Sequence, residues 1–442
     1  MGIDLKLSAL AGDRAKARLE LAVAALLFAC PVVLLSVRSG ASTCFTILVI
    51  LSLVYLIVTA PAYPDRFSEK AVKAYAAAMA SLVLATAINE LAFFRFALGS
   101  FDGPSRFMFA IPIYLMLREM RAETVSAMQY GLPIGAILAA LSVVLYAPNW
   151  TSGGRAGTYF SNAIHFGGLA MVLGILSALS INWLRKDTTP IIVLKLIGFC
   201  AGVFSSIQSG TRGAWIALPA AFAIFLFHHR KRISLLTAVA LSALLAVALL
   251  AIYFLSSATQ DRVHLLFTDF IGLFHSRMDT SPGFRIQGWK AALIISAQHP
   301  LFGVGPDEFK NYLPALRDAG IISATAAEVA VSEVHNEILL RTVSLGIFGL
   351  VSILAIYFVP LALFMRRTRA ASPYQRQAAL MGVCTVVAFL LFGLTVEIFN
   401  LKMTATFYSI TVAILLAAAT GREPAPIPDA VPSADGAGRP SV

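Results

Sequence analysis

The sequence predicts an all-α, polytopic membrane protein with about twelve transmembrane helices. Three observations predict this fold class. Of the 442 residues, 58% are hydrophobic and only 13% are charged, whereas a soluble domain has about 25% charged residues. Apolar runs of roughly 17–25 residues, long enough to cross a bilayer, recur along the chain. Basic clusters fall between alternate runs and therefore share one side of the membrane.

The apolar runs form two membrane regions on either side of one long polar loop. Residues 1–255 contain predicted spans at Leu19–Val37, Thr43–Ala60, Ala71–Phe94, Phe107–Leu117, Ser126–Tyr146, Ile164–Leu184, Pro190–Ile207, Ala214–Phe227 and Ile233–Leu255. Residues 336–420 contain spans at Asn336–Met365, Ala378–Ile398 and Met403–Ala419. Residues 421–442 are rich in Pro, Ala and Gly without periodicity, which predicts a disordered cytoplasmic tail.

The basic residues set the expected orientation. The N-terminus and alternate loops belong in the cytoplasm, with clusters at Lys6–Arg18, Arg66–Lys70, Arg118–Arg121, Arg185–Lys186, Arg230–Arg232 and Arg366–Arg376. In a bacterium the opposite side is the periplasm, so we expect a multi-pass inner-membrane protein in contact with membrane lipids. The net charge of +11 follows from this rule. Nucleic acid is not an expected partner, because no basic run exceeds HHRKR at His228–Arg232.

Residues 256–335 form the one large periplasmic loop and the expected catalytic face. Asp261–Arg277 has helical spacing of apolar residues and predicts a helix lying on the membrane surface. Phe284–Gln298 predicts a second helix, stopped by His299-Pro300. The Gly-rich turn at residues 303–306 is expected to be architectural, and a third short helix begins at Asp307.

Arg212 is the first candidate for chemistry. It lies in QSGTRGAW at the outer end of a predicted span, where an arginine often only anchors the helix at the lipid headgroups. The alternative is a phosphate ligand, because Gly210 and Gly213 let the backbone approach closely and a guanidinium matches a phosphate bidentately. The start of the next helix would add N–H donors.

Arg285 and Trp289 are candidates to hold the substrate from the loop. They stand at i and i+4 in GFRIQGWK and so share a helix face. A solvated loop arginine is the plain alternative. A second arginine facing Arg212 would build a diphosphate clamp, because like charges held together require an anion between them.

His335 is the catalytic candidate. It stands in SEVHNEILL at the outer mouth of the next span, where a cap or interface residue is the plain alternative. Glu333 and Glu337 flank it, and a carboxylate beside an imidazole fixes its tautomer and raises its basicity. Those are properties of a general base acting on a sugar hydroxyl. Which glutamate reaches the ring stays open, because neighbouring helical positions face different directions.

Arg341 is also a candidate to bind substrate. It lies inside an apolar run, where a charge is costly and must face a cavity or a partner. The same holds for Glu90, Lys195 and Glu397. Glu397 and Lys402 are expected to pair across a short outer turn.

No cofactor or metal is predicted. The sequence has no Walker motif, dinucleotide fingerprint, HExxH or paired-acid nucleotide-sugar motif. Its four cysteines lie in or beside apolar runs without a CxxC pair. No His, Cys or carboxylate residues have metal-ligand spacing.

Four pieces in series resemble the O-antigen ligase and polymerase superfamily of bacterial envelope enzymes. They are SGTRGAW at Arg212, R-x-x-x-W at Arg285, HPLFGVGPDEF, and HNEILLRTVSLGIFGL from His335. The resemblance covers roughly Ser209–Leu350, and the N-terminal helices match only in hydropathy. It implies a C-type glycosyltransferase fold that works without a metal on the periplasmic face.

The resemblance also implies substrates and roles. The donor would be a glycan on undecaprenyl diphosphate, and in the ligases the acceptor is a sugar of lipid A–core oligosaccharide. Arg212 and Arg285 would hold the diphosphate, and His335 would activate the acceptor hydroxyl for inverting attack. The leading hypothesis is therefore an O-antigen ligase. The alternatives are an O-antigen polymerase, a protein O-oligosaccharyltransferase or, in a different class, a transporter, although no inverted repeat is visible.

Overall fold

The computed structural model describes residues 2–62, 65–150, 155–255, 257–274, 278–330 and 333–424. Every named element in these ranges is a helix, so the all-α prediction is confirmed. Most of the predicted disordered tail, residues 425–442, lies outside the described residues. The apolar composition of the helices explains the class, because backbone groups in a bilayer must be satisfied within the chain.

Each predicted apolar run coincides with a helix. Residues 1–255 form α1 (Gly2–Val33), α2 (Gly40–Thr59), α3 (Lys70–Ala92), α4 (Asp102–Glu119), α5 (Ala122–Val125), α6 (Met128–Trp150), α7 (Ala163–Leu179), α8 (Thr189–Gln208), α9 (Arg212–Trp215), α10 (Ala217–His229) and α11 (Leu235–Leu255), with short 3-10 turns at Ala60–Ala62 and Leu98–Phe101. The second membrane region forms α16 (Glu337–Arg367), α17 (Pro373–Gly393) and α18 (Lys402–Thr420).

The number of spans is confirmed only in part. Among the described residues, seven helices have the length and hydropathy to cross a membrane: Gly40–Thr59, Lys70–Ala92, Ala122–Tyr146, Thr189–Gln208, Glu337–Arg367, Pro373–Gly393 and Lys402–Thr420. Two shorter apolar helices are Ala163–Leu179 and Leu235–Val247. The protein is therefore a multi-pass membrane protein by length and composition, and a total of about twelve spans stays a prediction.

The long loop folds into the predicted short helices. They are α12 (Ser257–Phe274), α13 (Ser281–Gln298), a 3-10 turn at Phe309–Tyr312, α14 (Leu313–Asp318) and α15 (Ala324–Ala330). Thr280 caps α13, since its Oγ1 accepts a hydrogen bond from the Gly283 N–H at 3.3 Å. The helix ends before Pro300, as expected. The helices α13 to α15 enclose a small apolar core of their own.

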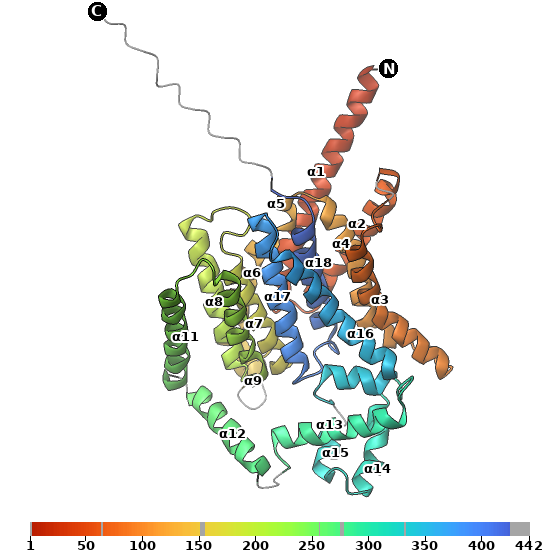
Figure 1. The fold of residues 1–442 in the computed structure, drawn as a ribbon, viewed down its shortest axis with the longest axis vertical. Helices are drawn as coiled ribbons and strands as arrows, with labels where there is room; N and C mark the ends of the chain where they lie inside the picture. The colour runs from red at the N-terminus through yellow and green to blue at the C-terminus, as the bar shows by residue number, and fades with distance from the viewer. Residues whose placement is uncertain are drawn as a thin grey trace, which may run out of the picture.

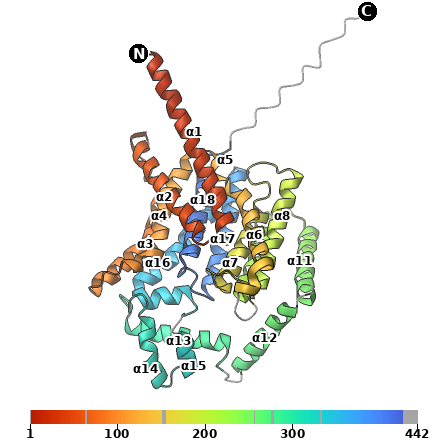
Figure 2. The same ribbon diagram turned by 180° about the vertical axis from the view of Figure 1, so that it is seen from behind.

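The bundle has two chemically different ends. At one end lie the start of α5, the end of α18 and the protruding α1, and at the other lie α13, α14 and α15 (Figures 1 and 2). The first end, called here the basic end, holds the ion pairs Arg118–Glu69, Arg121–Glu20 and Arg185–Glu123. The second is called the loop end. This segregation agrees with the charge pattern of the sequence, while the assignment of each end to a compartment stays a prediction.

Helix α18 occupies the centre of the bundle. Its residues from Thr404 to Ala419 are all buried, and many of them are Ala, Ser or Thr. Small side chains let neighbouring membrane helices approach closely. The Tyr408 hydroxyl donates to the Ile356 carbonyl at 2.8 Å and so ties α18 to α16. Helices α16 and α18 are therefore held in a fixed position relative to each other.

A break in α16 is filled by the turn at residues 299–305. The break lies at Gly346, where φ is 62° and ψ is −147°. Three backbone hydrogen bonds of 2.9 Å join the two segments: Val304 N to Val343 O, Gly305 N to Ser344 O, and Ile347 N to Pro300 O. Backbone groups freed by a break must find partners inside a membrane protein. The turn is thus architectural, as expected, and it fixes the outer half of α16.

Helix α3 completes this junction. The Asn89 side-chain N–H donates to the Phe302 carbonyl at 2.6 Å and to the Ser344 carbonyl at 3.2 Å. Gly303 has φ 68°, and a Cβ there would lie 2.5 Å from the Ser344 carbonyl carbon. The close backbone contact requires glycine at this position.

Candidate functional site

The connection between α17 and α18, residues 394–401, organises the loop end. Glu397 lies here, outside the span that ends at Gly393, and its Oε1 accepts a hydrogen bond from the Val334 N–H, next to His335. Its Oε2 accepts from the Asn400 side chain. The expected Glu397–Lys402 pair is wrong, because Lys402 begins α18 and pairs with Asp102 of α4 instead.

His335 is held in a strained backbone conformation at the mouth of α16. Its φ is 59°, in the left-handed region that non-glycine residues rarely adopt. Asn336 then caps α16 through Oδ1, which accepts from the Leu339 N–H at 3.1 Å. The imidazole is half-buried, with 18% of the side chain exposed. Strain of this kind persists where the surroundings fix it, and it is common at functional sites.

The structure answers which glutamate faces the imidazole. Glu333 Oε2 lies 3.1 Å from His335 Nδ1, at ion-pair distance, although the angles are not those of an aligned hydrogen bond. Burial acts to raise the pKa of Glu333, but His335, His165 and Arg285 outweigh it, so its pKa lies below the usual value. Glu333 therefore presents a negative charge to the ring.

Glu337, the other flanking glutamate, serves the fold of α16. Its side chain is 0% exposed, and Oε1 pairs with Arg341 Nε at 2.6 Å. Its Oε2 accepts from the Phe399 N–H at 3.0 Å. Arg341 also approaches Asn400 Oδ1 at 3.5 Å. A buried arginine needs a partner for its charge, and Glu337 is that partner for Arg341. The burial of Arg341 is therefore explained without the predicted contact with substrate.

We expect Arg341→Met to destabilise the protein by about 3–5 kcal/mol, because it leaves the Glu337 carboxylate buried without its ion pair. The double variant Arg341→Met/Glu337→Gln should regain most of this loss, since no charge is then buried. Thermal unfolding in detergent measures both. A single variant that unfolds like the wild type but loses activity would instead make Arg341 a substrate ligand.

Arg285 and Trp289 lie on α13, beside residues 333–336, which are called here the His335 loop. The Trp289 indole N–H donates to the His335 carbonyl oxygen at 3.4 Å, so this residue supports the histidine backbone. Arg285, one turn earlier on α13, is near enough to lower the pKa of Glu333. The predicted common face of the two side chains therefore points towards the candidate base.

Arg212 reaches the same connection from the membrane bundle. It begins α9 after Gly210, which has φ 63°. A Cβ on its neighbour Gly213 would lie 2.5 Å from Thr395 Oγ1, so α9 packs directly on residues 394–401. Arg212 is half-buried. Both α9 and the residues next to His335 therefore contact the same short connection, α9 at Thr395 and Val334 at Glu397.

Two residues near this connection were not predicted. Arg155 Nε donates to the Ser209 carbonyl at 2.9 Å, which places it at the turn before Arg212. His165 is buried, with Nδ1 2.8 Å from Asn162 Oδ1 and Nε2 3.3 Å from the Glu397 carbonyl oxygen. The signal for Arg155 was present in the sequence, because it is the one basic residue in the Gly-rich outer loop TSGGRAG.

A cavity of about 160 Å³ lies behind the His335 loop. Glu333, Arg341, Glu397 and Asn400 line it, together with residues 306–310 of the long loop. Ligand cavities usually have about 300–1,000 Å³, so this one suits water molecules better than a sugar. A large substrate would bind on the open face of the site. Among the residues that the structure describes, no His, Cys, Asp or Glu group is arranged to hold a metal ion.

Glu397 predicts a pH dependence of stability. Burial raises its pKa from 4.5 to about 8, against the Val334 N–H bond that lowers it. In the unfolded chain the carboxyl loses its proton near pH 4.5, while in the folded protein it keeps it until about pH 8. Folding therefore binds a proton in this window, and stability falls as pH rises from 5 to 8. We expect Glu397→Gln to flatten the decline of Tm over this range.

That measurement compares two proteins that share every histidine, so other titrations cancel. Wild type and variant are unfolded thermally in the same detergent at several pH values. If Tm changes with pH by the same slope in both proteins, Glu397 is ionised in the folded protein over this range.

Comparison with known proteins finds a family that this chain resembles in part. Residues 197–354 match the sequence model of the family described as O-antigen ligase. A protein of Haemophilus influenzae (strain ATCC 51907 / DSM 11121 / KW20 / Rd), described as uncharacterized, is 22% identical over 296 residues, which cover 66% of this chain and 72% of that protein.

The matched segment, residues 197–354, contains all five predicted site residues. They are Arg212, Arg285, Trp289, His335 and Arg341. It also contains the turn at residues 299–305 and the break in α16. The α17–α18 connection, with Glu397, follows outside the matched segment and completes the site from the C-terminal helices.

Proposed function

We propose that this protein is an O-antigen ligase. It transfers a glycan from undecaprenyl diphosphate to the lipid A–core oligosaccharide at the periplasmic face of the bacterial inner membrane. The observation that carries the proposal is His335, held in a strained conformation at the loop end with Glu333 at 3.1 Å. The match of residues 197–354 to the O-antigen ligase family model supports the reaction class.

The arrangement of His335 supports a role as general base. Glu333 faces Nδ1, an arrangement that would favour the tautomer with its proton on Nδ1 and its lone pair on Nε2. Nε2 would take the proton of the acceptor hydroxyl as its oxygen attacks the anomeric carbon. Attack from the face opposite the diphosphate inverts the configuration. The new glycosidic bond forms as the bond to the diphosphate oxygen breaks.

Arg212 and Arg285 would stabilise the leaving group. The diphosphate departs with both electrons of the broken bond, so it needs positive charge more than a proton. Guanidinium groups hold phosphate oxygens bidentately. Arg212 begins α9, which packs on the α17–α18 connection, and Arg285 lies on α13, near enough to Glu333 to lower its pKa. In this reaction they stand where other glycosyltransferases use a metal.

The buried charges favour an enzyme over a transporter. Lys195 pairs with Asp187 at 2.8 Å and donates to the Ser180 carbonyl, in the loop that ends α7. Glu90 accepts from the Ala97 N–H at the end of α3. These groups have structural partners near helix ends, whereas transporter sites lie at broken helices near the midplane.

The test is a gel of lipopolysaccharide from cells that lack this protein, with and without the wild-type gene. A ligase predicts core without attached polymer, while full-length polymer remains on its lipid carrier. Core that carries a single repeat unit would identify a polymerase. An unchanged ladder would overturn both and direct attention to protein glycosylation.

A further inference from the structure

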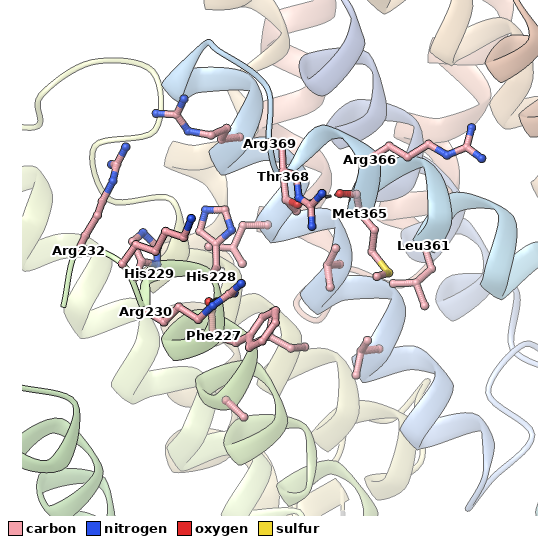
Figure 3. A pocket seen from close by; sticks show the side chains of 17 residues that line it. Phe227, His228, His229, Arg230, Arg232, Leu361, Met365, Arg366, Thr368 and Arg369 are labelled. Atoms are coloured by element: carbon pink, nitrogen blue, oxygen red, sulfur yellow. Dashed lines mark hydrogen bonds between the residues drawn. The ribbon is translucent and has the colours of Figure 1, made fainter. Parts of the chain in front are cut away.

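A large groove lies away from the candidate site, at the basic end. It is a groove of about 1180 Å³ between α10, α16 and α17. Figure 3 shows His228, Arg230 and Arg232 from the end of α10 on one side and Met365 and Thr368 from the end of α16 on the other. The groove exceeds the usual 300–1,000 Å³ of a small-molecule site.

The mouth of the groove is strongly basic. Six Lys and Arg residues line it: Arg230, Lys231, Arg232, Arg366, Arg369 and Arg376. None of the described residues that line it is acidic. Elsewhere at the basic end arginines have carboxylate partners, as in Arg118–Glu69 and Arg185–Glu123. The groove therefore concentrates positive charge that this part of the protein does not neutralise, beyond what the positive-inside rule requires.

Two of these arginines are fixed by the backbone. Arg376 Nη1 donates to the carbonyls of Ala370 and Ala371, at 2.8 and 2.5 Å. Arg230 stacks over the Phe227 ring at 4.0 Å and donates to the Phe227 carbonyl at 2.8 Å. Each guanidinium has five N–H donors, so these bonds leave others to bind an anion. A preorganised donor loses less entropy on binding.

The depth of the groove is apolar. Its walls are formed by Ile224, Leu361, Leu380, Val383 and Val387. Arg376 and Val387 belong to the same helix, and at a rise of 1.5 Å per residue the groove follows α17 for about 16 Å. The groove thus has a charged mouth at the membrane surface and an apolar channel that runs towards the membrane interior. An amphiphile with an anionic head has the complementary form.

We propose that this basic groove binds an anionic phospholipid from the adjacent membrane leaflet. The phosphate contacts Arg232, Arg369 and Arg376, and one acyl chain lies between α10 and α17. Basic pockets between membrane helices bind anionic headgroups by this combination of charge and apolar contact. The lipid would join α10 to α16 and α17, whose far ends carry the candidate site. This inference is independent of the transferase proposal.

The experiment uses the full-length protein in detergent. Native mass spectrometry follows the binding of phosphatidylglycerol, with phosphatidylcholine of the same chains as the zwitterionic comparison. We expect wild type to retain one phosphatidylglycerol in preference to phosphatidylcholine. Arg232→Ala/Arg369→Ala should weaken this binding at least about tenfold, because charge-assisted hydrogen bonds to the phosphate are lost. Both side chains are exposed, so the variant is expected to fold.

Two further variants separate a site from general attraction. Arg367→Ala/Lys186→Ala removes the same charge from the basic end, at residues that do not line the groove, and should leave phosphatidylglycerol binding unchanged. Val387→Trp fills the apolar channel without altering charge, and should weaken binding. Equal loss in the control pair, no effect of Val387→Trp, or displacement of the lipid by inorganic phosphate would each overturn the proposal.

Discussion

Replacing His335 with alanine is expected to lower glycan transfer about 10²–10⁴-fold, which is the usual contribution of a general base. The substitution should lower the rate of glycan transfer without lowering the yield of folded protein. His335 is half-buried, and its backbone is fixed by Trp289 and by the cap at Asn336. The measurement is transfer by purified protein from a lipid-diphosphate donor, followed as the yield of glycosylated core.

The strained backbone allows a sharper design. Asparagine and glycine both tolerate the φ of 59° that histidine adopts here. We therefore expect His335→Asn and His335→Gly to fold at least as well as His335→Ala while they remain inactive. His264→Ala, at an exposed histidine of α12, is the matched control and should keep wild-type activity. Wild-type transfer by His335→Asn would mean that the imidazole is not the base.

Replacing Gly346 with alanine is expected to prevent folding. The added Cβ would lie 2.2 Å from the Leu301 carbonyl oxygen and 2.7 Å from the Gly303 nitrogen. Both are backbone atoms of the turn that fills the break in α16, so no side-chain rotation relieves the overlap. With ψ at −147°, a φ of 62° lies close to the region that is essentially restricted to glycine, and it costs another residue about 1–3 kcal/mol. The expected result is little folded protein in a detergent extract, measured by size-exclusion profile.

Gly320→Ala is the control for this prediction. Gly320 has φ 67°, close to that of Gly346, but a Cβ there meets nothing within 4 Å. The control therefore carries a positive φ without the steric overlap. We expect it to fold with a small loss of Tm. Equal behaviour of the two variants would show that the steric overlap does not decide the outcome, and that the turn yields to the added methyl group.

Helix positions followed from the sequence because hydropathy is a local property. Each apolar run became a helix, and the helix stop at His299 and the short helices of the long loop were also correct. The gathering of basic residues at one end of the bundle followed from the alternation of the loops along the chain. What the sequence could not show is which helix ends meet. The pairing of Lys402 was predicted wrongly because its partner, Asp102, lies three hundred positions away in the chain.

The candidate residues could be named from the sequence, but their contacts could not. His335, Arg285 and Arg212 stood out because each lies in one of the four pieces that resemble the superfamily. The choice between Glu333 and Glu337 depended on a positive φ and on the pairing of Glu337 with Arg341, neither of which has a local signal. Glu397 was seen only as a buried charge, because its bond to the Val334 N–H joins the long loop to the α17–α18 connection, 63 positions further along the chain.

The break in α16 has a consequence for biosynthesis. The turn at residues 299–305 precedes α16 in the chain, so it leaves the ribosome before α16 does. The outer half of α16 cannot satisfy its own backbone at Gly346, and its partner is that earlier turn. Completion of α16 therefore requires the turn and the outer half of the helix to reach the same side of the membrane. A chain in which the two segments lay on opposite sides would be left with an unfinished helix, which quality-control proteases can recognise.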